Sequence, residues 1–533
     1  MRTCRALRGI AATALAATAL AAMPASAVTL RYANQGDLKA LDPYTLNETT
    51  TIAHHGHVYE GLIQRGKNLE ILPGLAERWE TPEPTRWRFY LRQNVKFSDG
   101  TPFTADDVVF SADRVRAPGS NFATRVPSGA KAVKVDDHTV DFVLPSPNPI
   151  LHYTWDTWYI MSKAWSEKNG ATAPTPASAS TPSYASLNAL GTGPYTIESH
   201  QPGVKTVFKK NPNYWGKIEG NIDEIVFTPI ANDSTRVSAL LSGEVDVIEP
   251  VPLQDINRVN GSGSAAVLTG PEVRTIFLGM DQVRDELVNS SVKGKNPFKD
   301  KRVREAFMLA IDIEAIKSRV MRGLSTPSAL MIAPEFFPLS KDFVRAKADP
   351  DKAKKLLADA GYPNGFEVGM NCPADRYVND GDICRAAIGM LARIGVKVNP
   401  LIEPKAQYFS KVLKSGGYNT SFFLLGWTPG TGDSHNVLYE IMGCRNDPKL
   451  SRGDTNLGGY CNPKLDEITE RVLVESDTKK RDLLIKEAFQ VAVDDVGYIP
   501  LHQQSLAWGV SKKVKLSQRA DNAVNLYWAT KGE

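Results

Sequence analysis

The first 27 residues have the pattern of a cleavable secretory signal, and this pattern fixes the compartment in which the rest of the chain must fold. Three arginines stand in the first eight residues, an uncharged Ala/Leu-rich run covers residues 10–23, and residues 25–27 read Ala-Ser-Ala. These are the positive, apolar and small-residue regions of such a signal. We therefore predict export to the periplasm with cleavage after Ala27. No later stretch approaches ~18 consecutive apolar residues, so no other membrane span is expected.

The length of the exported chain requires more than one domain. About 506 residues would follow the cleavage point, whereas a single core rarely grows past about 250–300 residues. Apolar residues alternate at 87–91 and 140–144, which predicts half-buried strands, and they recur at helical spacing at 303–310 and 353–360. This mixture indicates an α/β or α+β chain with at least two domains.

Four cysteines remain after cleavage, namely Cys372, Cys384, Cys444 and Cys461. Their number is even and the compartment is oxidising, which is typical of a disulfide framework. The short spacings favour the pairs Cys372–Cys384 and Cys444–Cys461, although four cysteines permit three connectivities. Because no C-x-x-C pattern is present, a structural zinc site is disfavoured.

Charge and motifs argue against several classes of function. The formal net charge of +4 falls to about +1 when the three signal arginines are removed, and no long charged block is present. We therefore expect no nucleic-acid partner. The chain contains no phosphate-binding G-x-x-x-x-G-K-[ST], no H-E-x-x-H and no G-x-S-x-G motif. These absences favour a protein that is not an enzyme and carries no cofactor, with a secreted hydrolase as a remote alternative.

Three histidines, His54, His55 and His57, form the most metal-like cluster in the sequence. As ligands they would contact nickel, heme or zinc. Histidines this close fit one metal ion awkwardly, and no acidic or cysteine partner is identifiable. We therefore favour a polar helix face that leads into Val58 and Tyr59, and we predict no metal site.

Eight segments in a fixed order carry the clearest signal in the chain. They are VYEGL (58–62), LPGLAERW (72–79), FYLRQNVKFSDGTPFTADDV (89–108), GTGPY (191–195), NPNYWG (211–216), LLSGEVD (240–246), NPFKDKRVR (296–304) and AID (310–312). Together they resemble the bacterial extracellular solute-binding protein family 5, whose members include dipeptide, oligopeptide, glutathione and nickel carriers. The resemblance covers essentially the whole exported chain.

This resemblance implies an α/β, two-lobed periplasmic-binding-protein clamshell of a type II-like kind, with an extra inserted domain. After the signal at 1–27, we expect lobe I at 28–75, 190–282 and 503–533, inserted domain II at 76–189, and lobe III at 283–502. Two crossing segments, near 278–282 and 502–505, would form the hinge about which the lobes close on a ligand. The resemblance also implies a monomer that delivers its ligand to the permease subunits of an ABC importer in the inner membrane.

The resemblance places the ligand between the lobes and suggests which residues contact it. Trp427 and Thr428 belong to the segment LGWTPGTGDSHN (425–436), which resembles the family's glycine-tryptophan motif. In dipeptide carriers an Asp after that tryptophan binds the ligand amine, but here the position falls on Gly430. Asp433 is the acid that could substitute for it, although it aligns better with a later, separate Asp of the motif. The competing interpretation of Trp427 is a buried core side chain.

Further candidates lie in two other segments. Arg376 stands where many relatives carry an arginine that faces the ligand carboxylate, which a guanidinium can grip with two parallel hydrogen bonds. Tyr377, its neighbour, is a further candidate. A second interpretation of Arg376, almost as well supported, is an ordinary surface residue. Asn47, Glu48 and Thr49 fall in the loop that approaches the ligand in relatives, where Glu48 could hold a cation.

The missing amine-binding Asp leaves two classes of ligand open. One is a short peptide or peptide-like solute. The other is a non-peptide solute such as an opine, a sugar derivative, or a nickel or heme chelate. A role as a periplasmic chaperone or sensor partner could coexist with either.

Overall fold

The computed structural model describes residues 27–176, 179, 181–445 and 452–532. The predicted secretory signal therefore lies almost wholly outside the described residues. Within those residues, no helix is both long enough and apolar enough to cross a bilayer.

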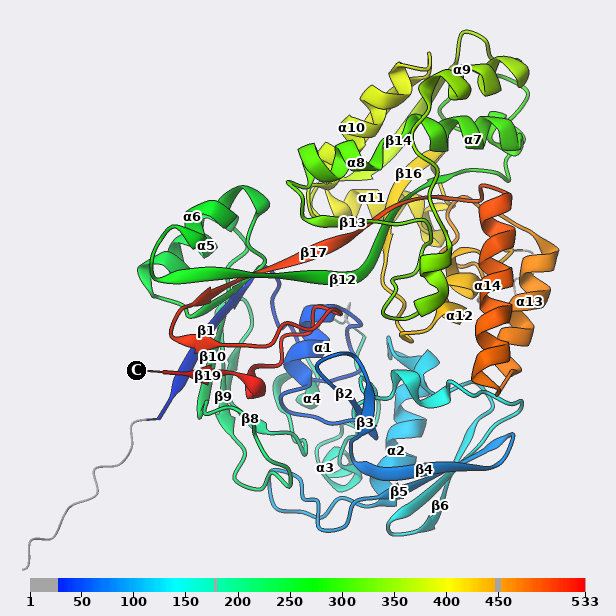
Figure 1. The fold of residues 1–533 in the computed structure, drawn as a ribbon. Helices are drawn as coiled ribbons and strands as arrows, with labels where there is room; N and C mark the ends of the chain where they lie inside the picture. Colours follow the sequence, from blue (N-terminus) through cyan, green and yellow to red (C-terminus); the bar gives the residue numbers. More distant parts are fainter. Residues whose placement is uncertain (1–26, 177–178, 180, 446–451, 533) are drawn as a thin grey trace, which may run out of the picture.

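One mixed sheet of eleven strands runs through both lobes. Its two longest strands, β12 (Ala265–Met280) and β17 (Ile499–Ser511), pair antiparallel at its centre and extend from one lobe into the other (Figure 1). Beyond β17, the first lobe adds five strands in spatial order: β11 (Val247–Glu249), β1 (Thr29–Asn34), β10 (Glu224–Pro229), β9 (Lys205–Lys210) and β8 (Tyr195–Gln201). Beyond β12, the second lobe adds β16 (Phe422–Trp427), β14 (Glu367–Pro373) and β15 (Lys397–Glu403), and β13 (Ser325–Pro327) pairs with β17.

The chain passes between the lobes inside β12 and β17. Residues 265–271 of β12 pair with β17, whereas from Thr275 onward β12 also pairs with β16 of the second lobe. The pairing register shifts between Pro271 and Thr275. The first crossing therefore lies near residues 271–275, earlier than the segment 278–282 expected from the sequence. Gln503 is the partner of Thr275, so the second crossing falls in the expected segment 502–505.

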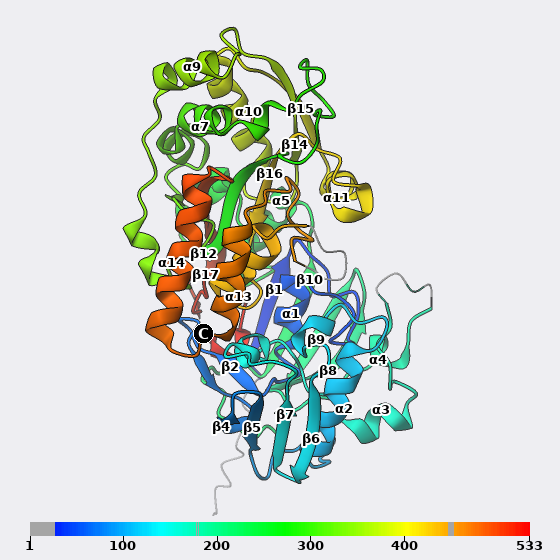
Figure 2. The ribbon, with the colours of Figure 1, turned by 90° about the vertical axis from the view of Figure 1, so that its right-hand side faces the viewer.

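A separate four-stranded sheet forms the inserted domain. Its order is β4 (Ala76–Glu83), β5 (Arg86–Leu91), β7 (Thr139–Val143) and β6 (Lys131–Asp136), and the helices of this segment are α2 (Ala105–Arg116) and α3 (Lys163–Lys168). Burial alternates along β5 as the sequence predicts. The backbone N–H of Thr104 donates to the Asp107 carboxylate over 2.9 Å, which fixes the start of α2. Both views place this sheet at the opposite end of the molecule from α7, α9 and α10 (Figures 1 and 2).

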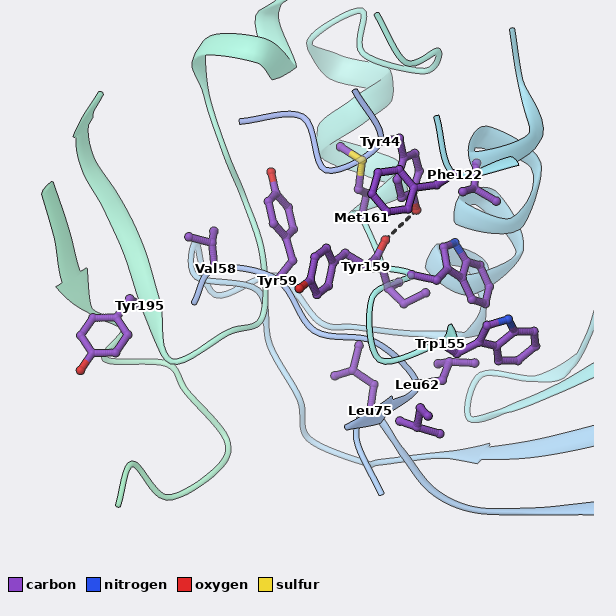
Figure 3. Close-up of a cluster of buried hydrophobic side chains, with 14 of the residues drawn as sticks. Tyr44, Val58, Tyr59, Leu62, Leu75, Phe122, Trp155, Tyr159, Met161 and Tyr195 are labelled. Carbon is purple, nitrogen blue, oxygen red and sulfur yellow. Dashed lines mark hydrogen bonds between the residues drawn. The ribbon is translucent and has the colours of Figure 1, made fainter. Parts of the chain in front are cut away.

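The inserted domain and the first lobe share one hydrophobic core. Leu62 and Leu75 of the first lobe lie in the same cluster as Trp155 and Tyr159 of the insertion (Figure 3). The hydroxyl of Tyr44 donates to the Tyr159 carbonyl oxygen over 2.6 Å. A shared core gives these two parts a common packing, so they form one half of the clamshell.

A fully buried ion pair also joins these two parts. Arg114, on α2, donates to both carboxylate oxygens of Asp42 over 3.0 and 2.6 Å. Both side chains are 0% exposed. The Nε and Nη2 groups also donate to the carbonyl oxygens of Ala171 and Ala173, so four of the five guanidinium N–H groups have partners and the buried charge is largely satisfied.

Helices cover the sheet of the second lobe. They are α7 (Lys301–Ala310), α8 (Ile313–Ala315), α9 (Pro350–Asp359), α10 (Asp380–Ala392), α11 (Lys405–Val412), α12 (Ser434–Asn436), α13 (Pro463–Val474) and α14 (Thr478–Asp494). In α7 the side chains at 303, 306, 307 and 310 are buried at helical spacing, as predicted. Strand β16 is buried along almost its whole length, as expected for a strand covered on both faces.

The remaining elements of the first half are short. They are α1 (Thr49–His55), α4 (Tyr184–Leu187), α5 (Asp233–Ser242), α6 (Ile256–Asn260) and the strand pairs β2 (Ile63–Arg65) with β3 (Ile71–Pro73) and β18 (Val514–Lys515) with β19 (Thr530–Lys531).

Both predicted disulfides are present in the second lobe. Cys372, at the end of β14, is bonded to Cys384 on α10, and Cys444 is bonded to Cys461. The local pairing favoured by the spacings is confirmed.

Candidate ligand-binding cleft

A cavity of about 550 Å³ lies between the two halves of the molecule. Its wall includes segments distant in sequence, among them the loop at 47–52, the insertion at 124–125 and 156–157, the second lobe at 376–377 and 425–430, and the C-terminal segment at 519–523. Sites for small ligands commonly have volumes of about 300–1,000 Å³ and lie between domains. The cavity is therefore large enough for a short peptide or a solute of similar size.

A second cavity, of about 530 Å³, shares three wall residues with the first. Arg274, Arg376 and Tyr377 line both. The rest of the second wall includes the buried carboxylates of Glu249 and Glu272. The shared residues thus form the boundary between the two spaces, next to the point where β12 crosses between the lobes.

The structure brings seven of the eight predicted ligand residues to the wall of the first cavity. These are Asn47, Glu48, Thr49, Arg376, Tyr377, Trp427 and Thr428. They come from both halves of the molecule, as a ligand held between lobes requires.

Trp427 ends strand β16 and is half-buried at the cavity wall. Its Nε1 donates to Asn436 Oδ1 over 2.8 Å, which fixes the indole ring. The competing interpretation of a fully buried core tryptophan does not describe this side chain. The adjacent Thr428 Oγ1 is buried and has no hydrogen-bond partner among the described residues.

Arg376 and Tyr377 are held by the start of α10. Both backbone N–H groups donate to Asp380 Oδ2 over 2.9 Å, and the Tyr377 hydroxyl donates to the Gly426 carbonyl oxygen over 3.2 Å. Arg376 keeps contact with solvent in the cleft. The walls of the cleft desolvate its guanidinium and lower its pKa, and the charge of Arg274 lowers it further. A guanidinium at a cavity wall is a strong partner for a carboxylate.

Glu48 has a structural contact as well as its place at the wall. Its carboxylate accepts from the backbone N–H and the hydroxyl of Thr51 over 3.0 and 3.2 Å and so caps the N-terminus of α1. The side chain is exposed at the cavity wall.

Asp433 has a different environment from that expected. It does not line either cavity. Its two oxygens accept from Arg481 over 2.7 and 2.8 Å, and one of them also accepts from the backbone N–H of His435. Both partners of the ion pair are buried. The geometry gives Asp433 a structural role and offers no free carboxylate to a ligand amine.

Several charged residues of the cavity wall could not be recognised as ligand contacts from the sequence. Arg65 and Asp156 approach to 3.9 Å, and Arg519 makes two hydrogen bonds of 2.8 Å to Asp521. Arg125 comes from the insertion. Their neighbours in sequence form no recognisable motif.

Arg274 is another charged wall residue that sequence reasoning missed. It lies in β12 at 3.0 Å from Glu272. The pattern Glu-Val-Arg (272–274) inside a long apolar strand is the one signal that could have indicated it.

The three clustered histidines are buried and not on a polar helix face, so that part of the expectation is wrong. His54, His55 and His57 are 4%, 2% and 3% exposed. One nitrogen of each ring faces a backbone carbonyl oxygen, of Thr50, Ala40 and Ala53 respectively. Burial lowers their pKa values to about 4, 4 and 3, so the rings are neutral at neutral pH. Across the described chain, no three metal-binding side chains gather around a common point.

Comparison with known proteins gives consistent matches. The family described as bacterial extracellular solute-binding proteins, family 5 Middle, matches residues 70–449. The dipeptide-binding protein of Escherichia coli K12 is 28% identical over 92% of this chain and 92% of its own. The glutathione-binding protein GsiB of the same strain is 25% identical over 89% of this chain and 88% of its own. The solved structure of HbpA2 from Haemophilus parasuis has 26% identity and a TM-score of 0.77 over 95% of this chain and 100% of its own.

Proposed function

Because the chain belongs to the bacterial extracellular solute-binding proteins of family 5, we propose that it captures a short peptide or peptide-like solute between its lobes and delivers it to an ABC-transporter permease. Similarity over nine-tenths of the chain to a dipeptide-binding and a glutathione-binding protein supports this ligand class. The protein would act in the periplasm as a monomer after removal of its signal, and as a carrier it would release its ligand unchanged.

The observation that carries this proposal is the cavity between the lobes with Trp427, Arg376 and Tyr377 at one wall. An indole face packs against apolar or planar parts of a ligand, and a guanidinium grips a carboxylate. On the facing side Asn47, Glu48 and Thr49 supply polar groups. We propose these six side chains, with Thr428, as the ligand contacts.

We also propose that the lobes move about the two crossings of β12 and β17. The first lobe and the insertion share a core and would rotate together, and residues 283–502 would form the opposing body. Closure would bury the ligand and create the surface that the permease recognises.

A thermal-shift screen on exported protein, unfolded and refolded to remove bound solute, tests the proposal. The panel contains free peptides of two to five residues, opines, sugars and nickel chelates. A ligand at 100 times its dissociation constant stabilises the folded state by about 2.7 kcal/mol, which is a visible shift. A shift with peptides supports the proposal, and a shift with non-peptides alone would refute it. Recovery of the ligand intact by mass spectrometry distinguishes a carrier from a hydrolase.

The variant Trp427→Ala tests the site. Loss of an aromatic contact should weaken binding of a ligand found in the screen by at least about 1 kcal/mol. Trp79→Ala, a tryptophan of the insertion that does not line the cavity, is the control. Unchanged affinity in Trp427→Ala would remove this residue from the site.

A further inference from the structure

The open position at Gly430 faces an arginine of the opposite half of the molecule. Gly430 lies in the loop between β16 and α12 of the second lobe, and Arg125 ends the short 3-10 helix Ala123–Arg125 of the insertion. A Cβ atom built on Gly430 would stand 3.8 Å from Arg125 Nη1 and would meet no other atom within 4 Å. Both residues line the main cavity and a smaller neighbouring one of about 200 Å³.

Arg125 forms no close ion pair with any carboxylate among the described residues, although the charge of Asp156 acts on it from a greater distance. Its Nε is buried without a hydrogen-bond partner, and the ring of Phe122 lies 5.4 Å from its Cζ. Its surroundings desolvate the guanidinium and lower its pKa, and the charge of Asp156 offsets this effect in part. The other arginines of this end of the cavity differ, because Arg519 is bound by Asp521 and Arg65 approaches Asp156. A desolvated, unpaired guanidinium gains most from an anion that enters the space beside it.

Besides Tyr439, the smaller cavity is lined by Glu440 and His435, and neither of these two provides a full negative charge at neutral pH. Burial raises the pKa of Glu440 to about 7, with a further contribution from Asp454. Burial lowers the pKa of His435 to about 4, so its ring is neutral. The cation of Arg125 therefore dominates the charge that a ligand meets beside Gly430.

We propose that Arg125 and the open Gly430 position form an anion subsite, so that the solute carries a carboxylate at the end where a free peptide would carry its ammonium group. A second carboxylate of the same ligand would bind Arg376. The ligand would therefore be a peptide-like solute with two carboxylates. This inference rests on the proposed function and specifies the ligand of that site. An ammonium group in the same place would meet the unpaired guanidinium as a like charge, which disfavours it.

Calorimetric titration of matched probes tests the inference. The probes are di-, tri- and tetra-alanine in three forms, N-succinylated, N-acetylated and free, all with a free C-terminal carboxylate. They place an anion, a neutral group or a cation at the same end. We expect the succinyl form to bind about 10- to 100-fold more tightly than the acetyl form, the scale of a charge-assisted hydrogen bond, and the free form to bind most weakly.

Two variants assign the preference to this subsite. Arg125→Gln removes the cation of the subsite and should abolish the preference for the succinyl over the acetyl form. The double variant Arg125→Gln/Gly430→Asp, in which the new carboxylate has no arginine beside it, should reverse the order in favour of the free amine. Arg78→Gln, an exposed arginine of the same domain, is the control and should leave the order unchanged.

The outcomes separate the two proposals. If the free peptides bind as tightly as the succinyl forms, or if Arg125→Gln keeps the preference, the anion subsite is refuted while peptide capture stands. If no peptide form binds, including the panel of the thermal-shift screen, the proposed function fails and the subsite with it.

Discussion

Replacing Asp433 with Asn should destabilise the second lobe without weakening ligand binding. In the folded protein Arg481 donates to Asp433 over 2.7 and 2.8 Å, with the two side chains 10% and 7% exposed. Asn keeps the size of the side chain and its ability to cap α12, so the substitution removes mainly the charge. Removal of one partner from a buried pair costs about 3–5 kcal/mol. We expect the lower end, because neither side chain is fully buried.

Urea unfolding followed by tryptophan fluorescence measures this cost. The double variant Asp433→Asn/Arg481→Met also removes the unpaired arginine charge. It should therefore regain much of the lost free energy of unfolding. Asp342→Asn is the matched control, because Asp342 bonds Lys486 on the same helix α14 over 2.6 Å but at the surface. Its unfolding midpoint should change little, since exposed pairs contribute little.

Ligand affinity provides the second readout. Asp433 does not line the cavity, so the folded Asp433→Asn variant should bind ligand as the parent does. If this variant unfolds at the same urea concentration as the parent and loses affinity, the reasoning is refuted and Asp433 is a ligand contact.

Three further predictions follow from buried groups. Asp42→Asn leaves the fully buried Arg114 without its counter-ion and should lower the free energy of unfolding by about 3–5 kcal/mol, measured in urea. A loss under about 1 kcal/mol would contradict this expectation. The two disulfides close short loops with sequence separations of 12 and 17 residues, and reduction should lower the free energy of unfolding by about 3 kcal/mol for each bond. Calorimetry with and without reductant measures this loss. An unchanged melting temperature would count against the prediction. Stability should also fall on acidification, because burial lowers the pKa of six histidines to about 4 or below: His54, His55, His57, His152, His435 and His502. Their folded-state pKa values lie below the unfolded value of about 6.5, so their contribution is present above pH 6.5 and is lost as pH falls through 4. Burial raises the pKa of Glu60, Glu249 and Glu440 to about 7 and also raises the pKa of Asp107, Asp156, Asp380, Asp466 and Asp482, and these carboxyls act in the opposite sense. We expect the histidines to dominate, because each is shifted about as far as the three glutamates and there are twice as many of them. Urea titrations between pH 7 and pH 4 that show constant or rising stability would refute the prediction.

Local patterns predicted much of the fold. The alternation at 87–91 became β5, and the helical spacing at 303–310 became α7. The short cysteine spacings gave the observed disulfides. The ordered motifs indicated the family and placed Trp427 and Arg376 at the cavity between the lobes. These features were predictable because periodicity, short loop closure and motif order are properties of neighbouring residues.

The charge pattern of the site was decided only by the tertiary structure. Asp433 is paired with a residue 48 positions away, and Arg125 stands opposite Gly430 although the insertion and the second lobe are far apart in sequence. The histidines at 54–57 look polar in the sequence, yet the surrounding core buries them. A side chain's pKa, its counter-ion and its access to a ligand depend on which distant segments pack around it. The sequence by itself therefore determined what kind of protein this is, whereas the packing of distant segments determined which charges are free to meet its ligand.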